Sequence, residues 1–243
     1  MKMERHRIHE LFPEEVLKEL DAIRTDVRNT DNNIKASKML KLLGPLGFTE
    51  IGSGTNRLCV RNIDYIYKIA MDSYGIRDNW TEFNMSMELQ PYVTKTYECN
   101  GLIAVAEYVS IMTKEEFRDS KENIRNILAI ITQDYLVCDM GTIGKNYMNF
   151  GYTEDGSLVI LDYGYIYPLD RKIMHCTKCG SLLQWDRDYS ELVCSKCGKT
   201  HKPIDIRDRM WKDAENFSNQ GEVVKPRKAV PIIIGGKVCG SIG

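Results

Sequence analysis

The spacing of apolar residues along the chain predicts four amphipathic helices before residue 140. They cover residues 13–28, 36–43, 76–90 and a longer segment beginning at Ser120, whose hydroxyl can cap a helix. Apolar residues recur three or four positions apart, as in helices with one buried face. The predicted faces are Val16, Leu17, Leu20, Ile23 and Val27 in the first helix, Trp80, Phe83, Met87 and Leu89 in the third, and Ile124, Ile127, Leu128, Ile131 and Tyr135 in the fourth.

Between the second and third helices the pattern changes to that of short strands. Residues 57–61 and 65–70 are predicted to be strands on either side of the turn Asn62-Ile63-Asp64. Residues 101–109 form a continuous apolar run that is typical of a buried strand.

Composition places the chain among ordinary globular proteins. Its 243 residues can bury one good core, or one core plus a small appendage, and the net charge of −1 gives no overall field that would favour nucleic acid. No apolar segment approaches the roughly 20 residues that cross a bilayer, and residues 1–9 lack the apolar region of a secretory signal. Four of the eight cysteines form two C-x-x-C pairs, which favours a metal site in a reducing compartment over disulfides. We therefore expect a soluble cytoplasmic protein.

The strongest chemical signal is Asp162-Tyr163-Gly164, at the end of the apolar run 158–161. Asn149 stands thirteen residues upstream, and Glu154-Asp155-Gly156 between them supplies a tight turn, because Asp-Gly accepts a positive φ. Protein-kinase folds use an Asp and an Asn in this relation to hold the magnesium ions of bound ATP. Taken alone, the triplet is also typical of a plain loop after a buried strand, so its interpretation depends on the upstream residues.

Two upstream features carry the chemistry of a phosphate site. The paired glycines of Gly52-Ser53-Gly54 let backbone amides approach a polyphosphate because no Cβ intervenes, although such a pair alone is also typical of a hairpin turn. Lys68 is charged in the otherwise apolar strand 65–70, either as an edge lysine that reaches solvent or as a cation directed at phosphates. The second role requires an anionic partner, and Glu82 on the following helix is the natural candidate.

The order of these motifs along the chain resembles the protein-kinase-like superfamily, and most closely the small, divergent kinase-like proteins encoded by bacteriophages. The likeness spans about residues 48–167 and includes the helix start from Asp78 to Glu82. It implies an α+β, two-lobed fold with a truncated C-lobe. The motifs that carry it are Gly52-x-Gly54, Lys68, Glu82, Glu107-Tyr108-Val109, Asn149 and Asp162-Tyr163-Gly164.

The resemblance also implies a role for each matching residue. Glycines 52 and 54 would cover the phosphates of ATP, and Lys68, oriented by Glu82, would contact them. The backbone of Glu107 and Val109 would bind adenine beside the gatekeeper Ala106. Magnesium ions would be held by Asn149 and Asp162, an oxygen ligand set that suits a hard ion.

The chain departs from the family pattern at two positions. Arg57 replaces the third glycine of the phosphate loop, which makes that loop stiffer and more basic, and we count it among the expected nucleotide-binding residues. The catalytic Asp that normally stands five residues before the magnesium-binding Asn149 is here Gly144, and the nearest upstream acid is Asp139. Either the loop 141–147 carries an insertion and Asp139 still acts as the general base, or the base is absent; we favour Asp139.

The two cysteine pairs are separated by fourteen residues, each is followed by a glycine, and together they resemble a zinc ribbon. Each C-x-x-C-G forms a knuckle that presents two thiolates, and two knuckles complete the tetrahedral coordination of a structural Zn²⁺. Residues 182–185 and 191–193 are predicted strands around the turn 186–190. The four ligands are Cys176, Cys179, Cys194 and Cys197.

The remaining histidines and cysteines of interest receive simpler interpretations. His175 and His201 flank the knuckles and are predicted to be surface residues rather than ligands. Cys59, Cys99, Cys138 and Cys239 lack metal-binding spacing and are expected to be ordinary thiols. Segment 175–203 carries five basic residues against three acids, a small excess that weakly favours a contact with nucleic acid or an acidic protein. A packing module without a partner is an equally good interpretation.

The expected organisation has five parts: an N-terminal helical segment (1–46), a kinase-like N-lobe (47–109), a reduced C-lobe with the magnesium hairpin (110–174), the ribbon (175–203) and a C-terminal helix and tail (204–243). The expected function is an ATP- and Mg²⁺-dependent phosphotransferase acting on protein Ser/Thr, in the host cytoplasm if the protein is phage-encoded. One alternative is a pseudokinase that binds nucleotide or serves as a scaffold. The other is a nucleic-acid-binding, transcription-related factor that uses the ribbon.

Overall fold

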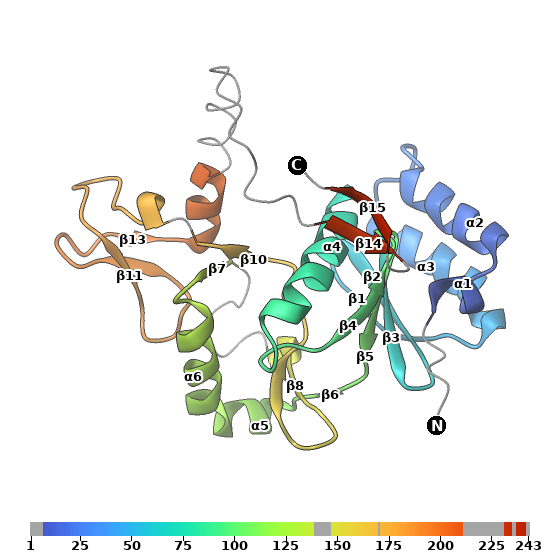
Figure 1. Ribbon diagram of the computed structural model, residues 1–243, viewed down its shortest axis with the longest axis horizontal. Coiled ribbons are helices and arrows are strands. Elements are labelled where there is room, and N and C mark those ends of the chain that lie inside the picture. The colour runs from blue at the N-terminus through green and yellow to red at the C-terminus, as the bar shows by residue number, and fades with distance from the viewer. Residues whose placement is uncertain (1–6, 139–146, 170, 211–230, 235–236, 242–243) are drawn as a thin grey trace.

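The computed structural model describes residues 7–138, 147–169, 171–210, 231–234 and 237–241, and has an α+β architecture (Figure 1). Its largest sheet has five antiparallel strands in the order β1-β2-β3-β5-β4. They are β1 (Thr49–Ser53), β2 (Arg57–Asn62), β3 (Tyr65–Ala70), β4 (Thr96–Cys99) and β5 (Ile103–Glu107). The strands predicted at 57–61, 65–70 and 101–109 are therefore confirmed, with slightly different ends.

The two faces of this sheet pack against different partners because side chains alternate along each strand. One face carries the apolar residues of β2, β3 and β5, and it packs on the helices α1 (Ile8–Leu11), α2 (Glu14–Thr25) and α3 (Asn32–Leu43). A short 3₁₀ turn, Gly44–Leu46, leads from α3 into β1. Figure 1 shows these helices on the side of the sheet away from α4. The residues on this face are Leu58, Val60, Tyr67, Ile69, Ile103 and Val105.

The first predicted helical face is confirmed only in part. Val16 and Leu20 are buried against the sheet, and Leu17 and Ile23 pack beside them. Val27 is 86% exposed, because α2 ends at Thr25 and the chain turns outward before residue 27. The prediction for Val27 is therefore wrong.

Helix α4 (Ser73–Glu88) joins β3 to β4 and buries a polar face. The apolar pattern predicts Met87 and Leu89 on the buried side: Leu89, just after the helix, is buried, but Met87 is 86% exposed and its prediction is wrong. The inward positions of α4 hold polar side chains that bind the sheet. The Asn79 amide, for example, donates to the carbonyls of Lys68 and Gly101, at 3.1 and 2.9 Å. The buried residues are Gly75, Asp78, Asn79, Glu82, Met85 and Ser86.

A second core lies on the far side of α4 and contains the helices α5 (Lys114–Asp119) and α6 (Lys121–Ile131). It also contains the small sheet β6-β8-β9, made of Ser110–Ile111, Phe150–Tyr152 and Leu158–Ile160, and the pair β7 (Tyr135–Val137) with β10 (Ile166–Pro168). Ile124, Leu128 and Ile131 are buried in this core as predicted.

Two details of the predicted helix at 120–135 are wrong. Ser120 makes no side-chain capping bond; its hydroxyl instead pairs with the Tyr152 hydroxyl at 2.6 Å, and Thr113 caps α5 with a reciprocal Glu116 contact. Tyr135 lies in β7, because α6 ends at Ile131.

The two cysteine pairs form a separate small module, here called the cysteine module (175–203). It contains a three-stranded sheet, β11-β12-β13, of residues Leu183–Trp185, Leu192–Cys194 and Thr200–His201. A short 3₁₀ turn, Arg171–Ile173, precedes it, and residues 203–210 are helical after it. Its core includes Leu136 of β7 and Ile206 of the following helix, and Arg125 of α6 binds Asp188 at 2.7 Å. The module is therefore fastened to the second core by apolar and ionic contacts.

Two further features complete the architecture. Strands β14 (Pro231–Ile234) and β15 (Lys237–Ser241) pair with each other in an antiparallel hairpin. Among the helices of the described ranges, none combines the length and apolar character that crossing a membrane requires.

Candidate functional site

A pocket of about 590 Å³ opens on the face of the main sheet opposite to helices α1–α3. This face has room for a cavity because three strands contribute small side chains to it, including Cys59, Ala106 and Gly52. The structure brings most of the residues singled out in the sequence to this pocket. Those that line it are Gly52, Gly54, Arg57, Lys68, Glu107, Val109, Asn149 and Asp162.

Lys68 is held in the pocket wall by two contacts. Its Nζ lies 2.6 Å from Glu82 Oε2 and 2.7 Å from the carbonyl of Leu161. Glu82 is fully buried on α4, and Lys68 is only 7% exposed on β3, a central strand of the sheet. The alternative of an edge lysine that reaches solvent is therefore excluded, and the expected partner Glu82 is the observed one.

Arg57 occupies a place that the sequence did not predict. We expect it from the sequence to make the glycine loop more basic and to bind nucleotide, but its guanidinium is buried at the first residue of β2 and bridges two carboxylates. Nη2 lies 2.8 Å from Glu82 Oε1 and 2.7 Å from Asp162 Oδ1. Burial alone would lower the pKa of Arg57, but Glu82 and Asp162 outweigh it and raise that pKa well above its ordinary value.

Asp162 and Asn149 are neighbours across the hairpin that joins β8 to β9. The amide of Leu161, next to Asp162, donates to the carbonyl of Asn149 at 2.8 Å. The Asp162 side chain is 46% exposed. Loss of solvation alone would raise the pKa of Asp162, but the charges of Arg57 and Lys68 outweigh it and lower that pKa below its ordinary value. The carboxylate is therefore ionised at neutral pH. A carboxylate and an amide oxygen in one pocket fit the ligand chemistry of Mg²⁺.

The glycine loop between β1 and β2 covers one side of the pocket. A Cβ built on Gly52 would meet nothing within 4 Å, and one on Gly54 would meet only the Arg57 carbonyl at 3.8 Å. Folding therefore does not require glycine at either position, whereas close approach of a ligand to the backbone would. Farther along, Asn56 fastens the loop, since its amide donates to Asp78 at 3.1 Å and to the Tyr165 hydroxyl at 2.9 Å.

The segment expected to bind adenine lies where β5 ends. The Glu107 carboxylate accepts from the amide of Lys95 at 2.7 Å, so this side chain is engaged with the neighbouring strand connection rather than with a ligand. The amide of Tyr108 donates to the carbonyl of Asp64 at 3.2 Å, and Val109 is buried. The pocket lining also contains apolar side chains, among them Ile51, Ile66, Ala106, Val109 and Leu161.

The sequence reasoning did not assign a role to Asp78, although it is buried and lines the pocket. Burial raises the pKa of Asp78, while the hydrogen bond from Asn56 and the charges of Arg57 and Arg77 oppose the rise. Asp78 is one helical turn before Glu82, so both face the pocket side of α4. That four-residue spacing was the signal that could have identified it.

The predicted general base, Asp139, lies outside the described residues, as does Gly144. Asp139 therefore stays a prediction. The tail from 211 to 230, which belongs to the expected C-terminal part, lies outside them too.

The four predicted zinc ligands meet at one point. All four sulfurs lie within 4.8 Å of one another, and the pairs Cys176–Cys197 and Cys179–Cys194 are 3.7 and 3.4 Å apart. A tetrahedron with zinc–sulfur bonds of about 2.3 Å has edges of about 3.8 Å, so this cluster fits a zinc ion. The prediction of a four-cysteine cluster able to hold such a metal is confirmed.

Both knuckles are built alike. The amide of Gly180 donates to the carbonyl of Cys176 at 2.9 Å, and that of Gly198 to Cys194 at 3.0 Å. The two glycines have φ of +70° and +69°, a left-handed conformation that other residues adopt only at a cost. The glycine after each pair is thus required by the turn.

The histidine predictions divide. His175 is exposed as expected, but His201 is only 7% exposed, so its prediction as a surface residue is wrong. His201 is buried because β13 pairs with β12 and brings it opposite Leu192. Burial lowers the pKa of His201, and the nearby cations Lys199 and Arg209 lower it further.

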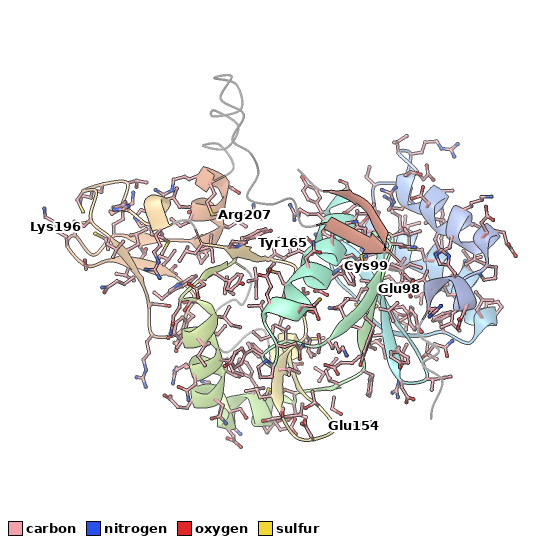
Figure 2. The ribbon with its side chains drawn as sticks, in the orientation of Figure 1. Glu98, Cys99, Glu154, Tyr165, Lys196 and Arg207 are labelled. Atoms are coloured by element: carbon pink, nitrogen blue, oxygen red, sulfur yellow. The ribbon has the colours of Figure 1, made fainter. Side chains whose placement is uncertain are left out.

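Charge in the cysteine module is unevenly distributed. Asp186, Asp188 and Glu191 lie around the β11–β12 turn, while the exposed lysines lie near the knuckles. Figure 2 shows Lys196 at the outer end of the module, directed away from the rest of the molecule. The exposed lysines are Lys178, Lys196, Lys199 and Lys202.

Comparison of the sequence with models of protein families and with curated proteins finds no match. Function is therefore inferred from the pocket itself.

Proposed function

We propose that this protein is an ATP- and Mg²⁺-dependent phosphotransferase that acts on protein Ser/Thr hydroxyls. One observation carries the proposal: Lys68, which is paired with Glu82, lines the same pocket as Asn149 and Asp162, and that lining also contains apolar side chains. A purine needs an apolar slot, and a triphosphate needs cations and a metal-binding carboxylate beside it.

The fold supports the same proposal. A five-stranded antiparallel sheet with a helix between its third and fourth strands, followed by a second core, is the arrangement that a two-lobed protein-kinase-like fold requires. In this proposal the second lobe is truncated, and the cysteine module follows Gly164 at the position where protein kinases place the activation segment. The domain boundaries given above stay predictions.

Each residue of the pocket has a role in the proposed reaction. Lys68, fixed by Glu82, would bind the α and β phosphates, and the backbone at Gly52 and Gly54 would cover them. Asn149 and Asp162 would hold the divalent cation, which supplies charge neutralisation to the phosphates when bound. Asp139 is the proposed acceptor of the proton from the attacking hydroxyl, a contribution typically worth about 10²–10⁴-fold in rate.

A pseudokinase is the second candidate, and one sequence observation favours it. The position five residues before Asn149 is Gly144, which has no side chain to accept a proton. In this candidate the pocket binds nucleotide without transferring a phosphoryl group, and the exposed lysines of the cysteine module bind a partner molecule. A nucleic-acid contact at these lysines would make binding fall steeply with salt concentration.

Two measurements on the full chain test the proposal. Thermal unfolding with increasing ATP and Mg²⁺ should shift upward, since a ligand that binds only the folded state stabilises it. Labelled phosphate from ATP should appear on the protein or on an added substrate protein, and Lys68→Met and Asp162→Asn should abolish it.

The outcomes separate the candidates. Nucleotide binding without transfer would indicate the pseudokinase, and the absence of both would refute the proposal. Loss of transfer in Asp139→Asn would support Asp139 as the base, whereas undiminished transfer in that variant would exclude it. The exposed Asp119→Asn serves as the matched control, with no expected effect.

A further inference from the structure

Among the described residues that line the pocket, Arg57 is the buried cation to which the proposed mechanism assigns no step. Its guanidinium is 7% exposed, and its two hydrogen-bonded carboxylates come from different parts of the chain, Glu82 on α4 and Asp162 after β9. Nη1 also lies 3.5 Å from the Asn79 amide oxygen. Nη1 and Nη2 are therefore already engaged with side chains of the protein.

The carboxylate of Glu82 is shared between two cations. Oε1 accepts from Arg57 and Oε2 from Lys68, at 2.8 and 2.6 Å, so one side chain orients both. Arg57 then extends the same chain of contacts to Asp162 at 2.7 Å. Two cations and two carboxylates thus form one continuous network that joins β2, β3, α4 and the end of β9.

The contact with Arg57 leaves Asp162 able to bind a cation. A carboxylate offers about four lone-pair sites; Arg57 uses one of them through Oδ1, and the backbone of Gly164 and the side chain of Glu82 also interact with this carboxyl group. The side chain is 46% exposed in the pocket wall, so acceptor capacity remains on the open side. Carboxylates that ligate metals are commonly held by such a hydrogen bond, which fixes their orientation.

We propose that Arg57 is a positioning residue for the divalent cation: it fixes the Asp162 carboxylate for metal binding and does not itself bind the nucleotide phosphates. This inference rests on the proposed function. A guanidinium suits the role because its planar, forked donors can serve two carboxylates at once, whereas a lysine ammonium is a single compact charge on a flexible stem.

Arg57→Lys is the informative variant, since it keeps the buried charge and removes the fork. We expect the affinity for Mn²⁺, measured by its paramagnetic resonance signal in the presence of saturating ATP, to fall about 10- to 100-fold. The affinity for ATP in the presence of a chelator should stay within about twofold of wild type. Arg118→Lys, on an exposed arginine, is the matched control and should change neither affinity.

A double-variant cycle identifies the route of the effect. Asp162→Asn alone should weaken Mn²⁺ binding, and adding Arg57→Lys should cause little further loss, because both changes act on the same carboxylate. A loss of metal-free ATP affinity in Arg57→Lys equal to its loss of Mn²⁺ affinity would overturn the proposal and make Arg57 a phosphate contact. Fully additive losses in the double variant would overturn it as well.

Two further outcomes are distinguishable. Wild-type protein that binds ATP and Mn²⁺ while Arg57→Lys behaves identically refutes the role of Arg57 alone. Wild-type protein that binds neither refutes the proposed function and this inference with it. If Arg57→Lys unfolds at the working temperature, Arg57→Gln with the same titrations replaces it, and unchanged Mn²⁺ affinity there also refutes the role.

Discussion

Replacing Glu82 with Gln is the most direct test of the ionic network in the pocket. Glu82 is fully buried and accepts from Lys68 Nζ at 2.6 Å, from Arg57 Nη2 at 2.8 Å and from the amide of Tyr163 at 3.2 Å. Gln keeps the volume and one acceptor oxygen but removes the charge that balances two buried cations. Removing one partner of a buried ion pair costs about 3–5 kcal/mol, because the remaining charge is left uncompensated.

That loss is a large part of the total stability of a domain, which is about 5–15 kcal/mol. Urea unfolding followed by tryptophan fluorescence measures it, and Trp80 on α4 is placed two residues from Glu82. Glu115→Gln, an exposed acid in the first turn of α5, is the control and should change stability by less than about 0.5 kcal/mol. Both proteins should be measured with zinc present and without nucleotide.

We also expect a second substitution to restore part of the stability that Glu82→Gln removes. Arg57 keeps its contact with Asp162 in Glu82→Gln, whereas Lys68 loses its carboxylate partner. Lys68→Met in the Glu82→Gln background removes that uncompensated cation, so the double variant should lose less than the sum of the single changes. A loss below about 1 kcal/mol in Glu82→Gln, or strictly additive losses in the double variant, would show that the network contributes little to folding.

Three further predictions follow from other contacts. Gly164→Ala should destabilise by about 1–3 kcal/mol in urea unfolding, because an added Cβ would lie 2.9 Å from the Cβ of Asp78; an unchanged midpoint would contradict this close packing. The raised pKa of Asp78 should make its contribution to stability largest in acid and lost as pH rises above about 3.9 through the folded-state pKa, so Asp78→Asn should flatten that part of the profile. Metal analysis should find one zinc ion per chain, lost in Cys194→Ser, and a chelator should lower the melting temperature of wild type but not of that variant.

The behaviour of α4 explains where apolar patterning succeeds and where it does not. The existence of the helix was predictable, but its orientation was not, since the rule that buried faces are apolar assigned Met87 inward. The inward face holds Asp78, Asn79 and Glu82 because each has a polar partner there: the Asn56 amide in the loop before β2, the Lys68 carbonyl and the Lys68 ammonium. In α4 the buried face is polar because it borders the pocket, and this face could be recognised only from the hydrogen-bond partners that the structure shows.

The sequence by itself determined which residues of a strand share a face and which cysteines form a metal-binding knuckle. Neighbouring side chains on a strand point to opposite faces, and a C-x-x-C-G knuckle closes within five residues, so both properties are local. Two such knuckles separated by fourteen residues resemble a zinc ribbon, so the sequence was enough to name the four cysteines as one cluster.

Only the tertiary structure decided the partners of Arg57 and the burial of His201. Arg57 meets carboxylates 25 and 105 residues away along the chain, and no local pattern specifies such distant contacts. His201 is covered because β13 adds to β12, a pairing that depends on how the chain returns after the second knuckle. Charge networks and burial are properties of the packed chain, because they are set by which distant groups exclude water from one another.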